Sequence, residues 1–540
     1  MKNYLTALGS APHNRATAGD GGHLSRGLRH ASTAFPEQQT REMTLTRLID
    51  AVESRPRTVL AVFLAVHALV WTALPALLYF NLPLDVIEAM TYGREWQLGY
   101  DKLPPLPWFL GEIAFRLTGS DASLYALSQG AVIVAFIAVW MTARPLVGAA
   151  SALAALLIID GMHYFNISAV KFNHNVIEMP LWAFAGFAFH AALRGNKLRH
   201  WVLLGIALGL AWWAKYFVVI LAAPLALFLL LDRDARRRLA APGPWIAAIV
   251  TVVVVAPNLY WLLQHGSQPF GYAQARAAAP GGVLDHLTRP LEFAGGQLLF
   301  LLPALLIAVP LFWPPAKPVD GPRADAFDRR IVSLLAFGPG LTLFVFSLIT
   351  GRDTNAMWGF PLWLFVGLWI VIFAPAVLDR TRLVRLGAVW AVVFVIFVAT
   401  FITDYLVLPH YDHRYRAAFF PGDRLSQAIT QRFEHATGAE PAYIIGSMWD
   451  GGNVAHYASE RPLPRVLVDG SPEHTPWIDM DDLRRRGAAV VWTQGDPHVL
   501  PANLAAAAPG AQVGAPFNLP YHRGAGVVHV GWAILPPRKP

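Results

Sequence analysis

Long apolar runs recur along the chain and are separated by short polar segments. About eleven of them approach the length that crosses a bilayer as a helix, if broken or short helices are allowed. They lie at residues 57–79, 122–143, 146–163, 176–193, 201–214, 216–231, 243–263, 294–313, 331–350, 357–377 and 386–405. The pattern predicts a mainly α fold, a polytopic membrane helix bundle.

Both ends of the chain depart from this pattern. Residues 1–45 are polar and contain no apolar signal-peptide core, so we interpret them as a disordered cytoplasmic tail. After residue 405, strand-like segments such as "PAYIIGS", "PRVLVDG" and "GAAVVWTQGD" alternate with helix-like segments such as "DGGNVAHYASE". This alternation predicts a small α/β domain over 406–540, following a transmembrane domain over 46–405.

The composition agrees with a membrane protein. Of 540 residues, 55% are hydrophobic and 14% are charged, whereas soluble domains carry about 25% charged residues. The net charge is +8, but the basic residues lie in short loops such as "RGNKLRH" and "DRDARRR", which argues against a nucleic-acid partner. By the positive-inside rule these loops are cytoplasmic, with the N-terminus inside and the C-terminal domain outside. The chain has no cysteine, which excludes thiol catalysis and cysteine-ligated metals.

The first outside loop, residues 81–121, is rich in charge. Its stretch "GYDKLPPLP" sets Asp101 and Lys102 against three prolines, which prevent a continuous helix and fix a bend near the membrane surface. Before the bend, Val86–Leu98 has apolar residues at near-helical spacing, which predicts a short interfacial helix. The bend holds the charged pair at a set depth at the outer face.

The segment "LDVIEAM…GYDKLPPLPWF" resembles the first-loop signature of polyprenyl-phosphate-dependent membrane glycosyltransferases of the GT-C class. This group includes protein mannosyltransferases and lipid A aminoarabinose transferases. The segments "GLAWWAKYFVVIL", "NLYWLLQHGSQPFGY" and "MWGFPLW" continue the resemblance in order, over about residues 70–405, and "GSMWDGGNVAHYASERPLPRVLVD" fits the outer domain of bacterial members.

The resemblance implies a reaction and a location. One hexosyl or pentosyl group would move from a polyprenyl-phosphate donor to a lipid, glycan or protein acceptor, by a single inverting displacement and with no nucleotide cofactor. The site would face the periplasm, in a bacterial inner membrane.

The resemblance assigns Asp85 as the base, because a carboxylate must lie within hydrogen-bond reach of the acceptor hydroxyl. The alternative for Asp85 is a helix cap. Glu88 lies one turn further on the same face, where it would orient the acceptor or raise the pKa of the base. An ordinary surface glutamate is the alternative for Glu88.

Three cations are candidates for binding the departing phosphate, which gains negative charge in the transition state. They are Lys102, Lys215 and Arg276. Lys215 stands between two apolar runs, where an ammonium is costly unless it faces a polar cavity or partner. The alternative for Lys215 is snorkelling to the interface.

The resemblance also implies a divalent metal ion, with Asp101 and His265 as ligands that would hold it against the phosphate. The alternative for His265 is an ordinary interfacial residue.

The outside loop "VKFNHNVIEMP" supplies polar candidates for contacts with the acceptor or the sugar. They are Asn173, Asn175 and Glu178, and the alternative is that they cap the following helix.

A secondary transporter or flippase of lipid-linked sugars is the alternative function, and a membrane scaffold is a third. A transporter would carry ionisable residues near helix midpoints and repeated halves. Here the acids lie in loops or at helix ends and no matching halves are evident, so the enzyme is favoured.

Overall fold

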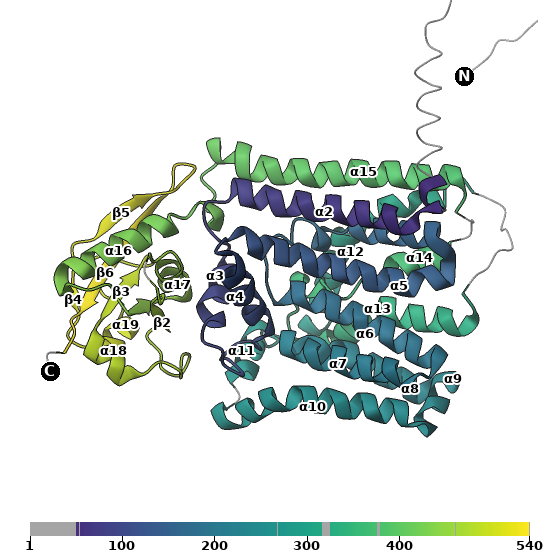
Figure 1. The fold of residues 1–540 in the computed structure, drawn as a ribbon, viewed down its shortest axis with the longest axis horizontal. Helices are drawn as coiled ribbons and strands as arrows, with labels where there is room; N and C mark the ends of the chain where they lie inside the picture. Colours follow the sequence, from purple (N-terminus) through teal and green to yellow (C-terminus); the bar gives the residue numbers. More distant parts are fainter. Residues whose placement is uncertain are drawn as a thin grey trace, which may run out of the picture. The chain divides into compact units, whose positions relative to one another are not determined.

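The computed structural model describes residues 50–538 except 53, 267, 316–323, 375–377 and 460. The predicted tail, 1–45, lies outside these residues. From residue 50 onward the chain forms a helical bundle, followed by a smaller domain built on a sheet (Figure 1).

The bundle consists of long helices that run side by side, with shorter helices at the end that faces the C-terminal domain (Figure 1). The long ones are α2 (Pro56–Leu78), α5 (Ala122–Asp160), α6 (His174–Gly195), α7 (Leu198–Ala214), α8 (Val219–Leu231), α10 (Pro242–His265), α12 (Asp285–Ala308), α13 (Ala326–Thr350) and α15 (Arg380–Ile402). The shorter ones at that end are α3 (Leu84–Gly93), α4 (Leu106–Thr118) and α11 (Gln268–Arg276).

The predicted count of eleven spans is not confirmed. Among the described residues, seven helices are long and apolar enough to cross a membrane, or eight if the bent pair Tyr216–Leu231 and Arg233–Ala240 forms one span. Helix α5 consists of two helical stretches, 39 residues in all, that meet at a break at Gly148, whose φ is 80°, so the predicted spans 122–143 and 146–163 both have helical counterparts. At 1.5 Å per residue it would measure about 58 Å, which exceeds the apolar core of a bilayer. In the predicted span 357–377, the α-helix α14 covers only Val366–Phe373.

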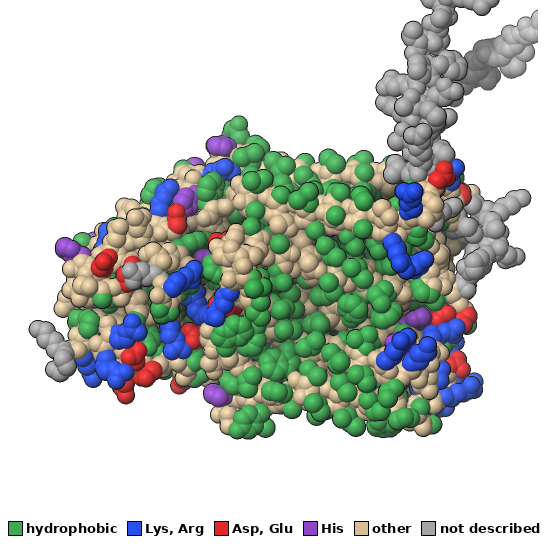
Figure 2. Space-filling model, in the orientation of Figure 1, with side chains coloured by type: hydrophobic (Ala, Val, Ile, Leu, Met, Phe, Trp, Pro, Cys, Tyr) green, Lys and Arg blue, Asp and Glu red, His purple; other side chains and the backbone are tan. Residues whose placement is uncertain are grey.

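The surface of the bundle is apolar, as expected of a multi-pass membrane protein. Figure 2 shows hydrophobic side chains spread over its face, and lysines, arginines and acids gathered at its end and on the C-terminal domain. Leu263 is 86% exposed and Leu299 is 70% exposed. Exposed apolar surface of this extent favours aggregation in water and is typical of a surface that contacts lipid.

The C-terminal domain is the predicted α/β domain. The three predicted strands are β1 (Tyr443–Gly446), β2 (Arg465–Val468) and β3 (Ala488–Trp492), and the path of the main sheet is β2-β1-β3-β6-β4. Strand β1 is parallel to β2 and β3, and β6 (Val527–Leu535) is antiparallel to β3. The remaining elements are β4 (Gln512–Val513), β5 (Phe517–Pro520), α16 (Gly422–Thr437), α17 (Met448–His456), α18 (Met480–Arg486) and α19 (Ala502–Ala507).

Both faces of this sheet are covered, which explains the continuous apolar runs of its strands. Leu483 of α18 and Leu504 of α19 pack with Ile445 on one face. On the other face, Leu425 of α16 and Val454 of α17 pack with neighbouring strand residues. The domain therefore has a core of its own and can present a firm surface to α3.

Candidate active site

One large cavity opens among α3, α11 and the junction of α7 with α8. Its volume is about 630 Å³, and tryptophans 108, 212 and 358 form part of its wall. Seven of the ten predicted site residues line it: Asp85, Glu88, Lys102, Asn173, Asn175, Lys215 and Arg276. The fold thus gathers candidates from distant parts of the sequence into one place.

Helix α3 presents the two predicted acids to this cavity. Pro83 is the N-cap residue, so Asp85 lies in the first turn and is not the cap. A carboxylate there is favoured by the positive end of the helix dipole. Asp85 and Glu88 share one face of the helix, whereas Ile87 and Met90 are fully buried. The helix ends at Gly93 and is therefore shorter than the predicted 86–98.

Asn173 holds the carboxylate of Asp85. Its Nδ2 donates to Asp85 Oδ2 at 3.1 Å, and its Oδ1 accepts from the backbone N–H groups of Asn175 and Val176 at the start of α6. One side chain therefore caps a helix and orients the predicted base. The protein surrounding Asp85 raises the pKa of its carboxyl by desolvation, and the Asn173 hydrogen bond opposes only part of that rise. A raised pKa makes a carboxylate a better proton acceptor.

The proline-rich bend places Lys102 at the same cavity. The Nζ of Lys102 lies 3.5 Å from Oε2 of Glu88. Burial raises the pKa of Glu88 to about 7, although Lys102 lowers it. Burial lowers the pKa of Lys102, but Glu88 and Asp101 raise it by more. The bend itself is fixed by His174, whose Nε2 lies 3.1 Å from the carbonyl oxygen of Pro104.

Lys215 interrupts two apolar helices. It follows α7 in an extended conformation, with φ of −167°. Its Nζ donates to Asn175 Oδ1 at 2.7 Å and lies 3.4 Å from Oε2 of Glu178, which is fully buried behind it. The rings of Phe217 and Trp358 lie 4.7 and 5.9 Å away, within cation–π range. The ammonium therefore faces a partnered, polar part of the cavity and does not snorkel to the interface.

Arg276, the last residue of α11, is the third predicted cation in this cavity beside Lys102 and Lys215, and Arg352 lines the cavity as well. Three cations around one cavity can bind a phosphate and stabilise the charge that it gains on leaving. Tyr272 lies one turn before Arg276 and also lines the cavity. Sequence reasoning did not single out Tyr272, although its i, i+4 spacing to Arg276 was the available signal.

The predicted metal ligands do not line this cavity. Asp101 accepts a hydrogen bond from the Tyr92 hydroxyl at 3.0 Å, and His265 stacks on Trp261 with its Nδ1 3.0 Å from the Trp261 carbonyl oxygen. No contact joins Asp101 to His265 among the described residues, and those residues contain no group of three or more His, Asp or Glu that could hold a metal ion. A metal ion held by Asp101 and His265 stays a prediction, and the proposed reaction does not use one.

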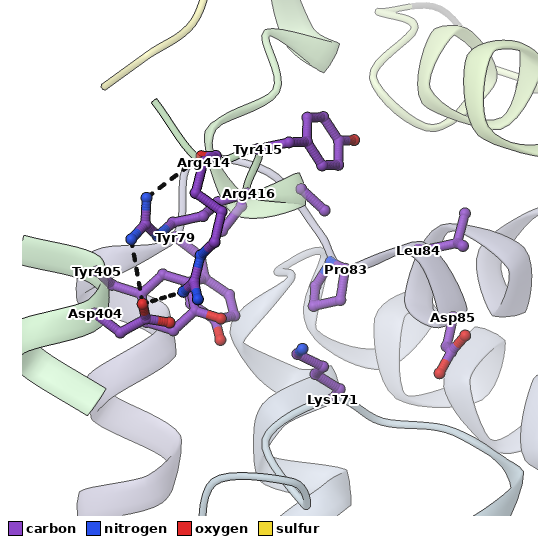
Figure 3. A pocket seen from close by; sticks show the side chains of 12 residues that line it. Tyr79, Pro83, Leu84, Asp85, Lys171, Asp404, Tyr405, Arg414, Tyr415 and Arg416 are labelled. Atoms are coloured by element: carbon purple, nitrogen blue, oxygen red, sulfur yellow. Dashed lines mark hydrogen bonds and ion pairs between the residues drawn. The ribbon is translucent and has the colours of Figure 1, made fainter. Parts of the chain in front are cut away.

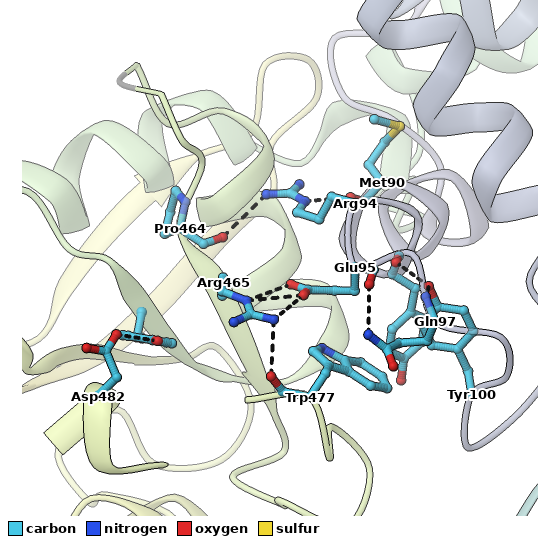
Figure 4. A network of polar contacts seen from close by, with 11 residues as sticks. Met90, Arg94, Glu95, Gln97, Tyr100, Pro464, Arg465, Trp477 and Asp482 are labelled. Carbon is cyan, nitrogen blue, oxygen red and sulfur yellow. Dashed lines mark hydrogen bonds and ion pairs between the residues drawn. The ribbon is translucent and has the colours of Figure 1, made fainter. Parts of the chain in front are cut away.

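The C-terminal domain contacts the residues that follow the C-terminal end of α3 (Figure 4). Both carboxylate oxygens of Glu95 accept from the Arg465 guanidinium, with Nε at 3.2 and 3.1 Å. Arg94 donates to the carbonyl of Pro464 at 3.3 Å. The ring of Trp477 meets Tyr100 edge-on at 5.1 Å. These contacts fix the helix that carries Asp85 and Glu88, and no local sequence pattern predicts them.

Solved structures resemble the fold of this chain. ArnT from Cupriavidus metallidurans bound to undecaprenyl phosphate matches with a TM-score of 0.58 at 15% identity, over 87% of this chain and 97% of that one. The apo form of the same protein matches with a TM-score of 0.56. This protein has a GT-C fold. The predicted fold class, a mainly α membrane bundle with a small α/β domain, is therefore confirmed.

Sequence comparisons agree with the GT-C fold. A family model described as dolichyl-phosphate-mannose-protein mannosyltransferase matches residues 102–261. Lipid A galacturonosyltransferase RgtD of Rhizobium johnstonii is 27% identical over 46% of this chain, and the match spans about half of that relative, 52% of its length. The lipopolysaccharide core galacturonosyltransferase RgtB of the same organism is 24% identical over 82% of this chain and 90% of its own length. The resemblance to GT-C membrane glycosyltransferases is thereby confirmed.

Proposed function

We propose that this protein is an integral membrane glycosyltransferase that moves one sugar from a polyprenyl-phosphate carrier to a lipid A or lipopolysaccharide core acceptor. The observation that carries the proposal is one cavity lined by Asp85 and by all three predicted cations, Lys102, Lys215 and Arg276. The named activities of the two relatives support the acceptor class. The undecaprenyl phosphate named with ArnT supports the carrier.

Each residue has a role in the proposed reaction. The acceptor hydroxyl oxygen attacks the anomeric carbon, its proton passes to Asp85, and the bond from that carbon to the phosphate oxygen breaks. The polyprenyl phosphate leaves with one more negative charge, which Lys102, Lys215 and Arg276 stabilise. Displacement in a single step inverts the anomeric configuration. Glu88 holds Lys102 in place, and Asn173 aims Asp85.

We further propose the setting and the sugar. The sugar is a hexose or pentose, with a hexuronic acid favoured by the names of the two relatives. The cavity faces the periplasm from a bacterial inner membrane, with the N-terminus in the cytoplasm. The basic loops of the sequence support that orientation.

The test is sugar transfer by the purified full-length protein in lipid nanodiscs, with undecaprenyl-phosphate-linked galacturonic acid and lipid A as substrates, read by mass spectrometry. Wild type should add one sugar mass. Asp85→Asn should lower the rate by about 10³-fold or more, since it removes the base. The matched control Asp481→Asn, on exposed helix α18, should retain activity.

Transfer by Asp85→Asn at the wild-type rate would show that Asp85 is not the base. Absence of transfer by wild type with either lipid A or lipopolysaccharide core as acceptor would refute the acceptor class. Movement of the lipid-linked sugar across a vesicle membrane, without transfer of the sugar to an acceptor, would establish the transporter alternative.

A further inference from the structure

A second cavity also reaches Asp85. Its volume is about 480 Å³, and Asp85 is the residue that it shares with the larger cavity (Figure 3). Its walls come from the loop before α3, from Lys171, and from the segment that links α15 to the C-terminal domain. That segment is held in place by backbone hydrogen bonds from Phe80 and Asn81 to the carbonyl of Ala418.

Two of the three cations in this second cavity are already neutralised. Arg416 pairs with Asp412 at 2.6 Å and with Asp404 at 3.2 Å, and Arg414 also pairs with Asp404. These pairs build a rigid wall and leave little free positive charge.

Lys171 is different. It lines the cavity from the loop before α6, and it is exposed. Across the part of the chain that the structure describes, its ammonium has no ion-pair partner. Figure 3 shows it between the arginine–aspartate network and Asp85. An exposed lysine of this kind is available to a ligand.

The rest of the cavity suits a sugar. Tyr79, Tyr405 and Tyr415 line it, and each combines an apolar ring with a polar hydroxyl. The rings of Tyr79 and Tyr405 lie 4.7 Å apart. Aromatic walls with a few polar groups are typical of sites that bind small ligands.

In the proposed reaction the donor and the acceptor must approach Asp85 from different sides. In an inverting displacement the attacking oxygen and the departing phosphate lie on opposite sides of the anomeric carbon. The larger cavity, which contains Lys102, Lys215 and Arg276, suits the phosphate of the donor. The acceptor must then reach Asp85 by another route, and the second cavity provides it.

We propose that the second cavity is the acceptor site and that Lys171 binds an anionic group, a phosphate or a carboxylate, next to the acceptor hydroxyl. This inference rests on the proposed function and adds to it a chemical requirement on the acceptor.

The test uses the full-length protein in nanodiscs, with Lys171→Met compared to Lys197→Met. Lys197 is an exposed lysine beyond the other end of the 22-residue helix α6. Three acceptors are supplied: phosphorylated lipid A, dephosphorylated lipid A, and dephosphorylated lipid A extended with an acidic core sugar. The second acceptor lacks the anionic group, and the other two separate phosphate from carboxylate.

Lys171→Met should raise the KM for anionic acceptors about tenfold, the loss expected for one charge-assisted contact in an exposed setting. It should leave the KM for the donor and for the neutral acceptor unchanged, and Lys197→Met should match wild type. An unchanged KM for anionic acceptors, an equal loss with the neutral acceptor, or a raised KM for the donor would overturn the proposal.

Binding without turnover separates the two proposals. Phosphorylated lipid A and the acidic-sugar acceptor are titrated, without donor, onto wild type and Lys171→Met. If wild type transfers no sugar, the proposed function fails, while weaker binding of either acceptor to Lys171→Met would still establish the site. If Lys171→Met binds both as wild type does, the acceptor site is refuted even when transfer is normal.

Discussion

Asn173 links the start of α6 to the predicted base, Asp85. A substitution at Asn173 can therefore change the pKa of Asp85 without changing the fold. Its amide N–H groups are needed for Asp85, whereas only its oxygen is needed for the cap. Serine retains a capping oxygen and lacks the amide donor. Asn173→Ser therefore separates the two roles.

We expect Asn173→Ser to move the acidic limb of the pH profile of kcat/KM to higher pH. Asp85 must be ionised to accept a proton, so activity falls as the pH drops through its pKa. Burial has already raised that pKa, and loss of the Asn173 hydrogen bond raises it further, because the bond favours the charged form. At high pH, where Asp85 is ionised in both proteins, the variant should still be slower than wild type, by about tenfold, because Asn173 also aims the carboxylate. A limb at the wild-type position would show that Asn173 does not tune Asp85.

At the scale of elements, helix α3 packs against the C-terminal domain on one face and presents its acids to the larger cavity on another. The glycine of α17 at position 452 allows this approach, since a Cβ there would lie 2.6 Å from a methyl carbon of Ile87. The domain therefore acts on the larger cavity through α3, because none of the residues that line that cavity comes from 406–540.

We expect the single charge reversal Arg465→Glu to lower kcat about tenfold by letting α3 shift, because small misplacements of a reacting group are costly. The KM for the donor should change little. The double variant Arg465→Glu with Glu95→Arg should recover most of the rate, since the pair is restored in reverse.

The charge reversal at Arg484, which pairs with Asp481 on exposed helix α18, is the control and should leave kcat unchanged. If the double variant stays as slow as the single one at equal protein level, the Arg465–Glu95 pair does not position the helix.

For the whole molecule, the orientation in the membrane can be measured by labelling single introduced cysteines, because the sequence contains no cysteine of its own. Asp481→Cys should react with a membrane-impermeant maleimide in intact spheroplasts, because α18 lies in the proposed periplasmic domain. Lys197→Cys, between α6 and α7, should react only after permeabilisation. The reverse pattern would place the C-terminal domain in the cytoplasm.

Much of the fold and site was predictable because local patterns encode it. The spacing of Asp85 and Glu88 places both on one helix face, and the cost of a charge between apolar helices marks Lys215. The alternation of strand-like and helix-like segments predicted the C-terminal α/β domain. Each of these signals lies within a few residues of sequence.

Other features depend on side-chain direction or on distant contacts, which local patterns do not encode. Asp101 lies next to Lys102 but turns to Tyr92 instead of the cavity. Glu95 and Arg465 are 370 residues apart. The predicted spans 122–143 and 146–163 form one 39-residue run, α5, that is broken at Gly148, and apolar length alone does not locate such a break.

The position of Asp85 between two cavities has a kinetic consequence. If Asp85 takes the proton of the acceptor while the donor is bound in the other cavity, both substrates must be present at the same time. The sugar then passes directly from donor to acceptor, and no covalent sugar–enzyme intermediate forms. Initial-rate plots at several fixed acceptor concentrations should intersect rather than run parallel. The protein would then leave its carrier intact until an acceptor arrives, which protects a costly activated sugar from water.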